Sequence, residues 1–123
     1  IGLIHGAGLD PYLGFYHQPS YNHAALASDL MESYRAQVCD RIILRAFKCH
    51  EFLEALADNT VSERSLGQEA LTILRKAYLR RLEEEVQQRG EKKAFLSLMH
   101  GDVFGLRKHL DDSQIKYQPW ISL

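Results

Sequence analysis

Long apolar runs are absent from this 123-residue sequence. No stretch approaches the roughly 18 consecutive apolar residues that a membrane-spanning helix needs, so we expect no membrane association of that kind. Cysteine is also scarce, and Cys39 and Cys49 are too few for a disulfide framework and lack the spacing of a zinc site. This cysteine usage fits the reducing environment of the cytoplasm best.

An excess of one charge is missing as well. The 15 basic and 16 acidic side chains give a formal net charge of −1, which excludes a histone-like positive coat. Any nucleic acid bound to this chain must therefore meet a local basic patch. Apolar residues make up 46% and charged residues 25%, as in an average globular protein, which excludes wholesale disorder.

Helical spacing of apolar residues runs through most of the chain, and we predict an all-α fold with a single helical domain over residues 1–123. We expect long helices over about residues 24–56, 66–89 and 91–110. The first of them should be central and well buried, because its apolar positions wrap widely around the axis. Period-two alternation is nowhere long enough to predict a sheet. The last residues should be extended, with Tyr117 and Trp120 as anchors.

The start of the chain carries several local signals. The first eight residues resemble the end of a helix that stops at glycine. Because the sequence begins at Ile1, we expect a fragment of a larger protein. Asp10 before Pro11 predicts a local cap and turn. Ser65 with Gln68 three residues later predicts a capping box at the start of the second long helix.

The residues best suited to chemistry lie between His17 and Arg35. Asp29 and Glu32 are three apart on a predicted helix, so both carboxylates project from one face. His17 lies in the irregular stretch before that helix, which could fold back over the acidic face. One imidazole with two carboxylates suits Mg²⁺ or Mn²⁺ better than structural zinc. By spacing alone, a solvated acidic face and a hydrogen-bonding histidine are the commoner interpretations.

Two longer motifs surround these residues. GLDPYLGFYH (residues 8–17), followed by SDLMESYR (residues 28–35), closely resembles the CRISPR-associated integrases of the "Cas-one" family, which capture foreign DNA as new spacers. The C-terminal YQPW (residues 117–120) is similar to the closing motif of the same family. The resemblance is densest over residues 8–47.

The resemblance implies a metal-dependent DNA endonuclease and integrase, which inserts spacers into a CRISPR array by 3′-hydroxyl transesterification during antiviral defence. Matched position by position, it implies His17 and Glu32 as ligands of Mg²⁺ or Mn²⁺ and Asp29 as a further catalytic acid. The family's third ligand, a glutamate on an upstream helix, and its N-terminal β-domain have no counterpart here, so we expect the fragment alone to be inactive. The implied partners are double-stranded DNA (prespacer and CRISPR repeat), a second copy in a homodimer, and the small "Cas-two" protein.

Basic side chains at helical spacing could meet DNA phosphates. The candidates for DNA binding are Arg35, Arg41, Arg45, Arg75 and Arg80. Arg35 could equally hold a carboxylate in place or contact the scissile phosphate. A solvated charged face is the alternative for the bases of the second long helix.

Four aromatic residues crowd the stretch before the first long helix: Tyr12, Phe15, Tyr16 and Tyr21. We expect most of them to pack in the core and fix the position of His17, with base stacking as the alternative. Cys39 should likewise lie inside the helix.

Two other functions remain open from the sequence. One is a non-catalytic helical interaction module or truncated product with an incomplete site. The other is a general repair nuclease on the same scaffold, which would prefer branched DNA. Weak Mn²⁺ binding that depends on His17 would separate a nuclease from the interaction module.

Overall fold

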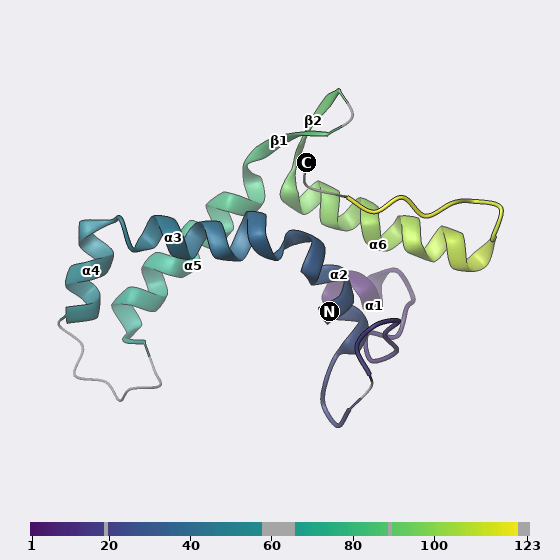
Figure 1. The fold of residues 1–123 in the computed structure, drawn as a ribbon, viewed down its shortest axis with the longest axis horizontal. Helices are drawn as coiled ribbons and strands as arrows, with labels where there is room; N and C mark the ends of the chain where they lie inside the picture. The colour runs from purple at the N-terminus through teal and green to yellow at the C-terminus, as the bar shows by residue number, and fades with distance from the viewer. Residues whose placement is uncertain (19, 58–65, 89, 121–123) are drawn as a thin grey trace.

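A computed structural model of the chain describes residues 1–18, 20–57, 66–88 and 90–120. Within these ranges the chain forms helices and one small hairpin. Their order is α1 (Gly2–Gly6), α2 (Ala25–Arg35), η1 (Ala36–Asp40), α3 (Arg41–Ala46), α4 (His50–Ala57), α5 (Gln68–Glu83), β1 (Glu85–Gln88), β2 (Glu91–Ala94) and α6 (Phe95–Asp111) (Figure 1). The predicted all-α class is confirmed. Among the helices so described, none combines the length and apolarity needed to cross a membrane.

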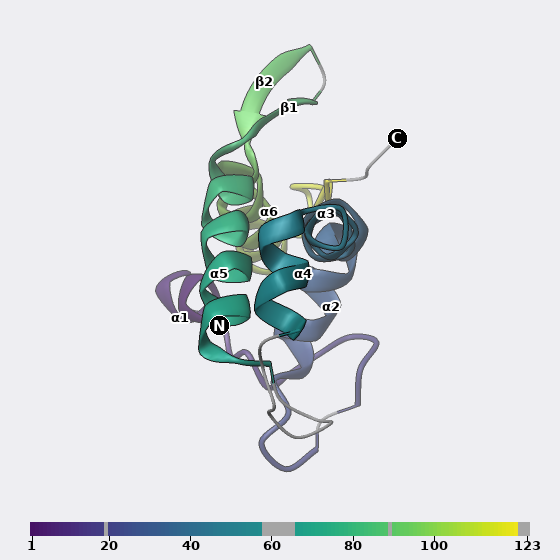
Figure 2. The same ribbon diagram turned by 90° about the vertical axis from the view of Figure 1, so that its left-hand side faces the viewer.

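The elements α2, η1 and α3 follow one another directly and form one rod, with a π-helical stretch in its middle (Figure 1). The expected helix over 24–56 is therefore interrupted, because α3 ends at Ala46 and α4 begins at His50. At the end of α3 the N–H groups of Lys48 and Cys49 bond to carbonyls three residues back, at 3.0 and 2.9 Å. This tightening turns the chain, so α4 folds back beside α5 instead of prolonging the rod (Figures 1 and 2).

The hairpin of β1 and β2 corrects the predicted helix boundaries at residues 89 and 91. Its two strands are antiparallel and paired from end to end. Gly90 lies in the tight turn with φ of +89°, a left-handed conformation that glycine adopts without steric cost. Most of the hairpin residues are charged or polar, and Val86 of β1 packs against the core. A period-two hydrophobic signal was therefore not available to predict these strands.

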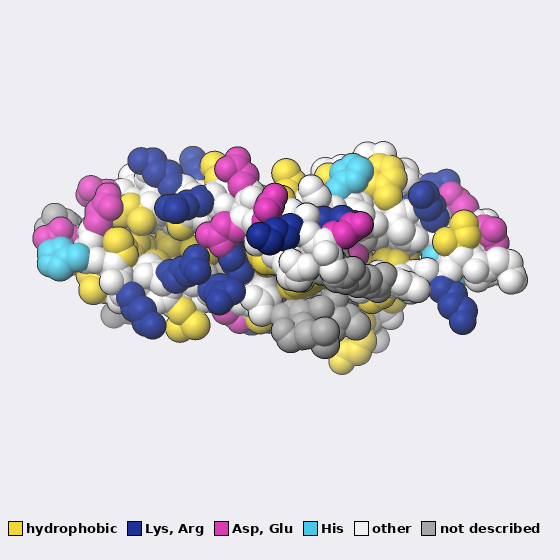
Figure 3. All heavy atoms as spheres, turned by 90° about the horizontal axis from the view of Figure 1, so that it is seen from above, with side chains coloured by type: hydrophobic (Ala, Val, Ile, Leu, Met, Phe, Trp, Pro, Cys, Tyr) yellow, Lys and Arg dark blue, Asp and Glu magenta, His cyan; other side chains and the backbone are white. Residues whose placement is uncertain are grey.

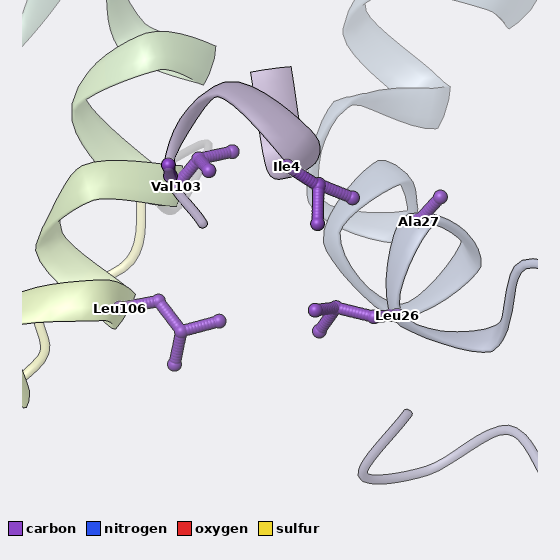
Figure 4. Packing of buried hydrophobic residues seen from close by; sticks show 6 residues of the cluster. Ile4, Leu26, Ala27, Val103 and Leu106 are labelled. Carbon is purple, nitrogen blue, oxygen red and sulfur yellow. The ribbon is translucent and has the colours of Figure 1, made fainter. Parts of the chain in front are cut away.

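The core consists of separate clusters spread along the rod. The first joins α1, the start of α2 and α6 through Ile4, Leu26, Ala27, Val103 and Leu106 (Figure 4). The second joins the middle of the rod to α6 and the tail through Tyr34, Val38, Ile42, Phe95, Leu98 and Trp120. The third joins α3, α4 and α5 through Ala46, Phe52, Ala55 and Ala70. Each end of the rod is thus held by its own contacts, independent of those at the other end.

The extended tail runs back along α6 (Figure 1). Trp120 is 5% exposed, its ring stacks on Tyr34 at 5.0 Å between centroids, and its backbone N–H donates to the Asp102 carboxylate at 3.0 Å. The Tyr34 hydroxyl donates to the same carboxylate, and burial together with this bond raises the pKa of Tyr34. Tyr117 packs half-buried against the first cluster. The predicted anchoring of the tail by Tyr117 and Trp120 is confirmed.

Other local predictions had mixed outcomes. The glycine stop after the first helix is confirmed, since α1 ends at Gly6 and Gly8 has φ of +72°. The rod is less buried than predicted, because outer positions such as Leu44 and Cys39 are exposed. The predicted capping residue Ser65 lies outside the described residues.

Candidate functional site

The loop before α2 is tied down at its start by a short turn. The backbone N–H of Tyr12 donates to the Asp10 carboxylate at 2.9 Å, which confirms the predicted cap and turn. The carbonyl of the buried Pro11 accepts the N–H of Leu26 at 2.9 Å. That N–H belongs to the first turn of α2, where the helix itself offers no partner, so the loop and the helix satisfy one another.

Asp29 fastens the rest of the loop. Its Oδ2 accepts the backbone N–H groups of Phe15 and Tyr16 at 2.6 and 3.1 Å. Its Oδ1 accepts the backbone N–H of His17 at 3.0 Å and the ring nitrogen Nδ1 of His17 at 2.5 Å. The carboxylate is 10% exposed and both oxygens are occupied. The structure therefore brings His17 and Asp29 together, and it gives Asp29 the geometry of a residue that positions the histidine.

Gly14 permits this close fit. A Cβ at this position would lie 2.7 Å from the Cβ of Ala25, 2.8 Å from Oδ2 of Asp29 and 2.8 Å from the carbonyl oxygen of His17. Contacts this short do not occur, and two of the three atoms are fixed by the backbone. The glycine of the loop motif is therefore required for the approach of the loop to α2.

The electrostatics of the pair set the state of the histidine ring. Burial opposes ionisation of Asp29, but the hydrogen bonds from Tyr16, His17 and Phe15 together hold the pKa of Asp29 well below its usual value. Because an ionised carboxylate only accepts hydrogen bonds, Nδ1 of His17 must be the protonated nitrogen of the neutral ring. Nε2 then keeps its lone pair, on a side chain that is 34% exposed. A carboxylate that orients a histidine in this way is typical of histidines that bind metal ions.

Glu32 lies one turn further along α2 and is not part of this network. Its side chain is 55% exposed and its carboxylate lies 3.5 Å from Nη1 of Arg35. Of the two interpretations of Arg35, this contact fits the one in which it holds a carboxylate. Within the ranges that the structure describes, no group of three or more His, Cys, Asp or Glu residues could hold a metal ion. His17 and Glu32 can thus supply only part of a metal site.

The aromatic residues of the loop do not pack in the core as predicted. Tyr12, Phe15, Tyr16 and Tyr21 are all exposed, Tyr21 to 96%. The position of His17 is fixed by the hydrogen bonds to Asp29, which makes aromatic packing unnecessary. No role was expected for His23, yet its ring lies 5.9 Å from that of His17, and its Nε2 lies 3.5 Å from Oγ of Ser28.

A second feature lies at the other end of the rod. A groove of about 540 Å³ runs between α3 and α5, with an apolar floor that includes Ile42, Ala46, Ile73 and Ala77. Its basic lining residues are Arg41, Arg45, Lys76, Arg80 and Arg81. Figure 3 shows Lys and Arg side chains surrounding hydrophobic ones over this part of the molecule. Three of the predicted DNA-binding residues thus gather here, whereas Arg35 lies on α2 and Arg75 is not among the described lining residues.

Arg81 and Glu84, which the sequence indicated only as members of a charged helical face, organise this groove. The Arg81 side chain is 6% exposed, its Nε donates to the carbonyl of Gln37 at 3.0 Å, and its guanidinium lies 4.6 Å from the centre of the Phe95 ring. Its Nη1 donates to Glu84, which also lies 3.4 Å from Nη1 of Arg45. The hydrogen bond from Arg81, with help from Arg45, lowers the pKa of Glu84 against the opposing effect of burial.

Comparisons with known proteins bear on both features. A sequence model of the family described as "CRISPR associated protein Cas1" matches residues 1–84. The CRISPR-associated endonuclease Cas1 1 of Archaeoglobus fulgidus is 36% identical over 93 residues, which cover 76% of this chain and 27% of that protein. The CRISPR-associated endonuclease Cas1 3 of Thermus thermophilus is 30% identical over 116 residues, covering 93% and 35%. The chain thus spans about a third of the length of these relatives.

One solved structure has the same fold. It is titled "Casposase bound to integration product" and matches with a TM-score of 0.74 and 21% identity, over 98% of this chain and 36% of that one. At this identity the likeness supports the fold alone. The match nevertheless includes the hairpin and α6, which lie beyond the residues that the family model matches.

Proposed function

Because the chain belongs to the CRISPR-associated Cas1 family, as its loop and helix motifs indicated, we propose that it forms part of a DNA endonuclease and integrase that inserts new spacers into a CRISPR array. The observation that carries the proposal is the contact between Nδ1 of His17 and the Asp29 carboxylate at 2.5 Å. It links the two sequence motifs of the family in space and presents one imidazole nitrogen with a free lone pair.

The donor atoms fit a divalent cation such as Mg²⁺ or Mn²⁺. Nε2 of His17 and the exposed carboxylate of Glu32 would be its ligands, and further ligands must complete the site, since the described residues hold no group of three. When bound, the ion would offset the negative charge that builds up on the non-bridging oxygens of the attacked phosphodiester. Asp29 would not bind the ion itself, and it acts through His17, whose tautomer and orientation it fixes.

The proposed reaction is a transesterification. A 3′-hydroxyl of the incoming DNA attacks a phosphodiester at the repeat boundary. Its oxygen forms a new P–O bond as the bond between phosphorus and the 3′-oxygen of the cut strand breaks, and the displaced oxygen takes up a proton in place of the one that the attacking hydroxyl loses. Arg35, exposed beside Glu32, can turn toward a scissile phosphate without breaking any buried contact. We propose double-stranded DNA as substrate, and a homodimer with the small Cas2 protein as the assembly that carries it out.

Strand transfer tests this function in a full-length protein that includes the chain. A labelled duplex with free 3′-hydroxyls is incubated with a plasmid carrying a CRISPR array and Mg²⁺ or Mn²⁺. We expect His17→Ala and Glu32→Ala to lower the yield by about 100-fold or more, since loss of an outer partner of a metal site alone costs 10–100-fold. The matched control is His50→Ala, which removes a histidine from an exposed His–carboxylate pair on α4.

Two results would contradict the proposal. Strand transfer that survives His17→Ala would show that the histidine is not needed for the reaction. Robust metal-dependent nicking of DNA by the 123-residue chain alone would show that its two ligands suffice. Absence of any Mn²⁺ binding by this chain would instead favour a non-catalytic interaction module.

A further inference from the structure

The groove between α3 and α5 is distinct from the loop that holds His17. Along the rod, Arg45 follows Asp29 by 16 residues, which corresponds to roughly 24 Å at the rise of an α-helix. The groove is also held by a different hydrophobic cluster, the one that joins α3, α4 and α5. It can therefore bind a ligand without rearrangement of the loop.

We propose that this groove binds the phosphodiester backbone of a nucleic-acid strand, and that Glu84 occupies the place of a phosphate until the strand arrives. The proposal rests on the proposed function for its substrate class. It adds the location of a binding site, the residues that form it, and a carboxylate that competes with the bound strand.

Charge is the first argument. Five basic side chains line the groove against two carboxylates, Glu51 and Glu84, although the chain as a whole carries a net charge of −1. Four of the five are arginines, whose planar guanidinium groups pair with phosphate oxygens through two parallel hydrogen bonds. The bases come from both walls, so a strand lying in the groove would be neutralised from two sides.

Glu84 supplies the second argument. Its carboxylate accepts from Arg81 on its own wall and lies 3.4 Å from Arg45 on the opposite wall, so one anion already bridges the groove. An ionised carboxylate and a phosphate present similar oxygen acceptors to a guanidinium. The contact with Arg45 is long and both side chains are partly exposed, so a phosphate can replace Glu84 there at small cost.

Arg81 supplies the third argument. Its buried guanidinium is fixed by Phe95 and by the carbonyl of Gln37, and it belongs to the wall of the groove. Its Nη2 is buried and has no hydrogen-bond partner among the described residues. A buried donor without a partner is costly, and a fixed positive charge beside an open groove favours an anion there.

The separation between Asp29 and Arg45 along the rod gives a scale for the length of a nucleic-acid strand that contacts both features. At 3.4 Å per nucleotide in one strand, the roughly 24 Å between Asp29 and Arg45 corresponds to about seven nucleotides. A base-stacked strand whose end lies at His17 would thus reach the level of Arg45 after about seven nucleotides, and a more extended strand after fewer.

Binding of a fluorescein-labelled 20-base-pair duplex, followed by anisotropy in EDTA, tests the proposal on the 123-residue chain. Arg80→Gln should weaken binding by about 3-fold or more and lower the slope of log K against log salt by about 1. Lys108→Gln, which removes an exposed charge on α6 outside the groove, should change the affinity by less than about 2-fold.

Removal of the competing carboxylate should act in the opposite direction. Glu84→Gln should tighten binding by several-fold if the variant keeps the circular dichroism spectrum of the parent. Because Glu84 also supports Arg81, a second variant is needed. Glu51→Gln removes the other groove carboxylate, which has no ion-pair partner among the described residues, and should tighten binding less.

Several outcomes would overturn the proposal. Equal effects of Arg80→Gln and Lys108→Gln would mean that the duplex responds to net charge and not to the groove. Unchanged affinity in folded Glu84→Gln and in Glu51→Gln would show that these carboxylates do not compete with the nucleic acid. Competition by polyglutamate at equal charge concentration would show that the groove binds acidic protein chains.

Failure of the groove and failure of the proposed function can be told apart. The binding assay contains no metal, so it does not depend on the ligands at His17 and Glu32. Loss of strand transfer in His17→Ala, together with normal duplex binding in Arg80→Gln, would support the proposed function and reject the groove as a binding site.

Discussion

Each end of the rod is organised around one carboxylate, and the two carboxylates are used in different ways. Asp29 is 10% exposed and accepts three backbone N–H groups and one imidazole. Glu84 is 33% exposed and contacts two guanidinium groups. Backbone donors cannot leave their acceptor without refolding of the loop, whereas the exposed side chain of Arg45 can turn to another anion. The first carboxylate is therefore structural, and the contact of the second with Arg45 is exchangeable.

Removal of Asp29 should have the largest effect on folding. Asp29→Ala leaves the donors of the loop without their charged acceptor, and we expect the free energy of unfolding to fall by about 2 to 3 kcal/mol in urea titrations. Asp111→Ala is the control, because it removes an exposed carboxylate that pairs with Arg107 at 2.7 Å and should cost less than about 1 kcal/mol. Similar losses in the two variants would mean that Asp29 is no more structural than a surface acid.

A methyl group at Gly14 should have the next largest effect. Gly14→Ala forces Ala25, Asp29 or the backbone of His17 to move, and overpacking of this kind costs about 1 to 3 kcal/mol. Gly101→Ala should change stability in the opposite direction by up to about 1 kcal/mol, because its Cβ would meet nothing within 4 Å and alanine favours the interior of α6. Thermal unfolding of both variants measures the difference, and destabilisation by both would contradict this account of the loop.

The pH dependence of Glu84 should be smaller. Its pKa is lowered in the folded chain, chiefly by Arg81, so its stabilising effect is complete above the unfolded pKa of about 4.3 and is lost as the pH falls below it. The difference in Tm between the parent and Glu84→Gln should therefore shrink from pH 7 to pH 3. A difference that stays constant over this range would show that the charge of Glu84 does not matter.

Glu32 should matter least for folding. Its side chain is 55% exposed and its one ion pair is 3.5 Å long, so Glu32→Ala should change the free energy of unfolding by less than about 0.5 kcal/mol. Urea unfolding measured next to Asp29→Ala makes the contrast between neighbouring acids on α2 explicit. A loss of 2 kcal/mol or more would assign Glu32 a structural role and weaken its proposed role as a ligand.

Much of the helical fold could be predicted, because apolar residues recur at helical spacing and glycine stops are explicit. The break after Ala46 could not, since residues 47–49 contain no proline or glycine. There α4 turns back because Phe52 and Ala55 pack against Ala46 and α5, a tertiary contact that no local signal announces. The hairpin was missed because its strands carry mostly charged and polar side chains.

The site divides in the same way. His17 and Asp29 are 12 residues apart, so spacing alone could not place them in contact. Their residue types suggested that the loop could fold back over the acidic face, and the resemblance to a family gave both residues a role. Gly14 in the same motif was a usable signal that the loop approaches another element closely. In the groove, Arg80 and Arg81 are adjacent in sequence, yet Arg80 is exposed and Arg81 is buried. Composition predicts both to be exposed, and only packing against Phe95 decides between them.

The central claim is that Asp29 holds His17 with Nδ1 protonated, so that Nε2 is free to bind a metal ion beside Glu32. The most direct measurement is an NMR titration of the 123-residue chain with Mn²⁺, which reports the tautomer of each histidine and the signals broadened by the paramagnetic ion. We predict the Nδ1–H tautomer for His17, and broadening at His17 and Glu32 before any at His50. An Nε2–H tautomer, or broadening that spares His17, would contradict the account.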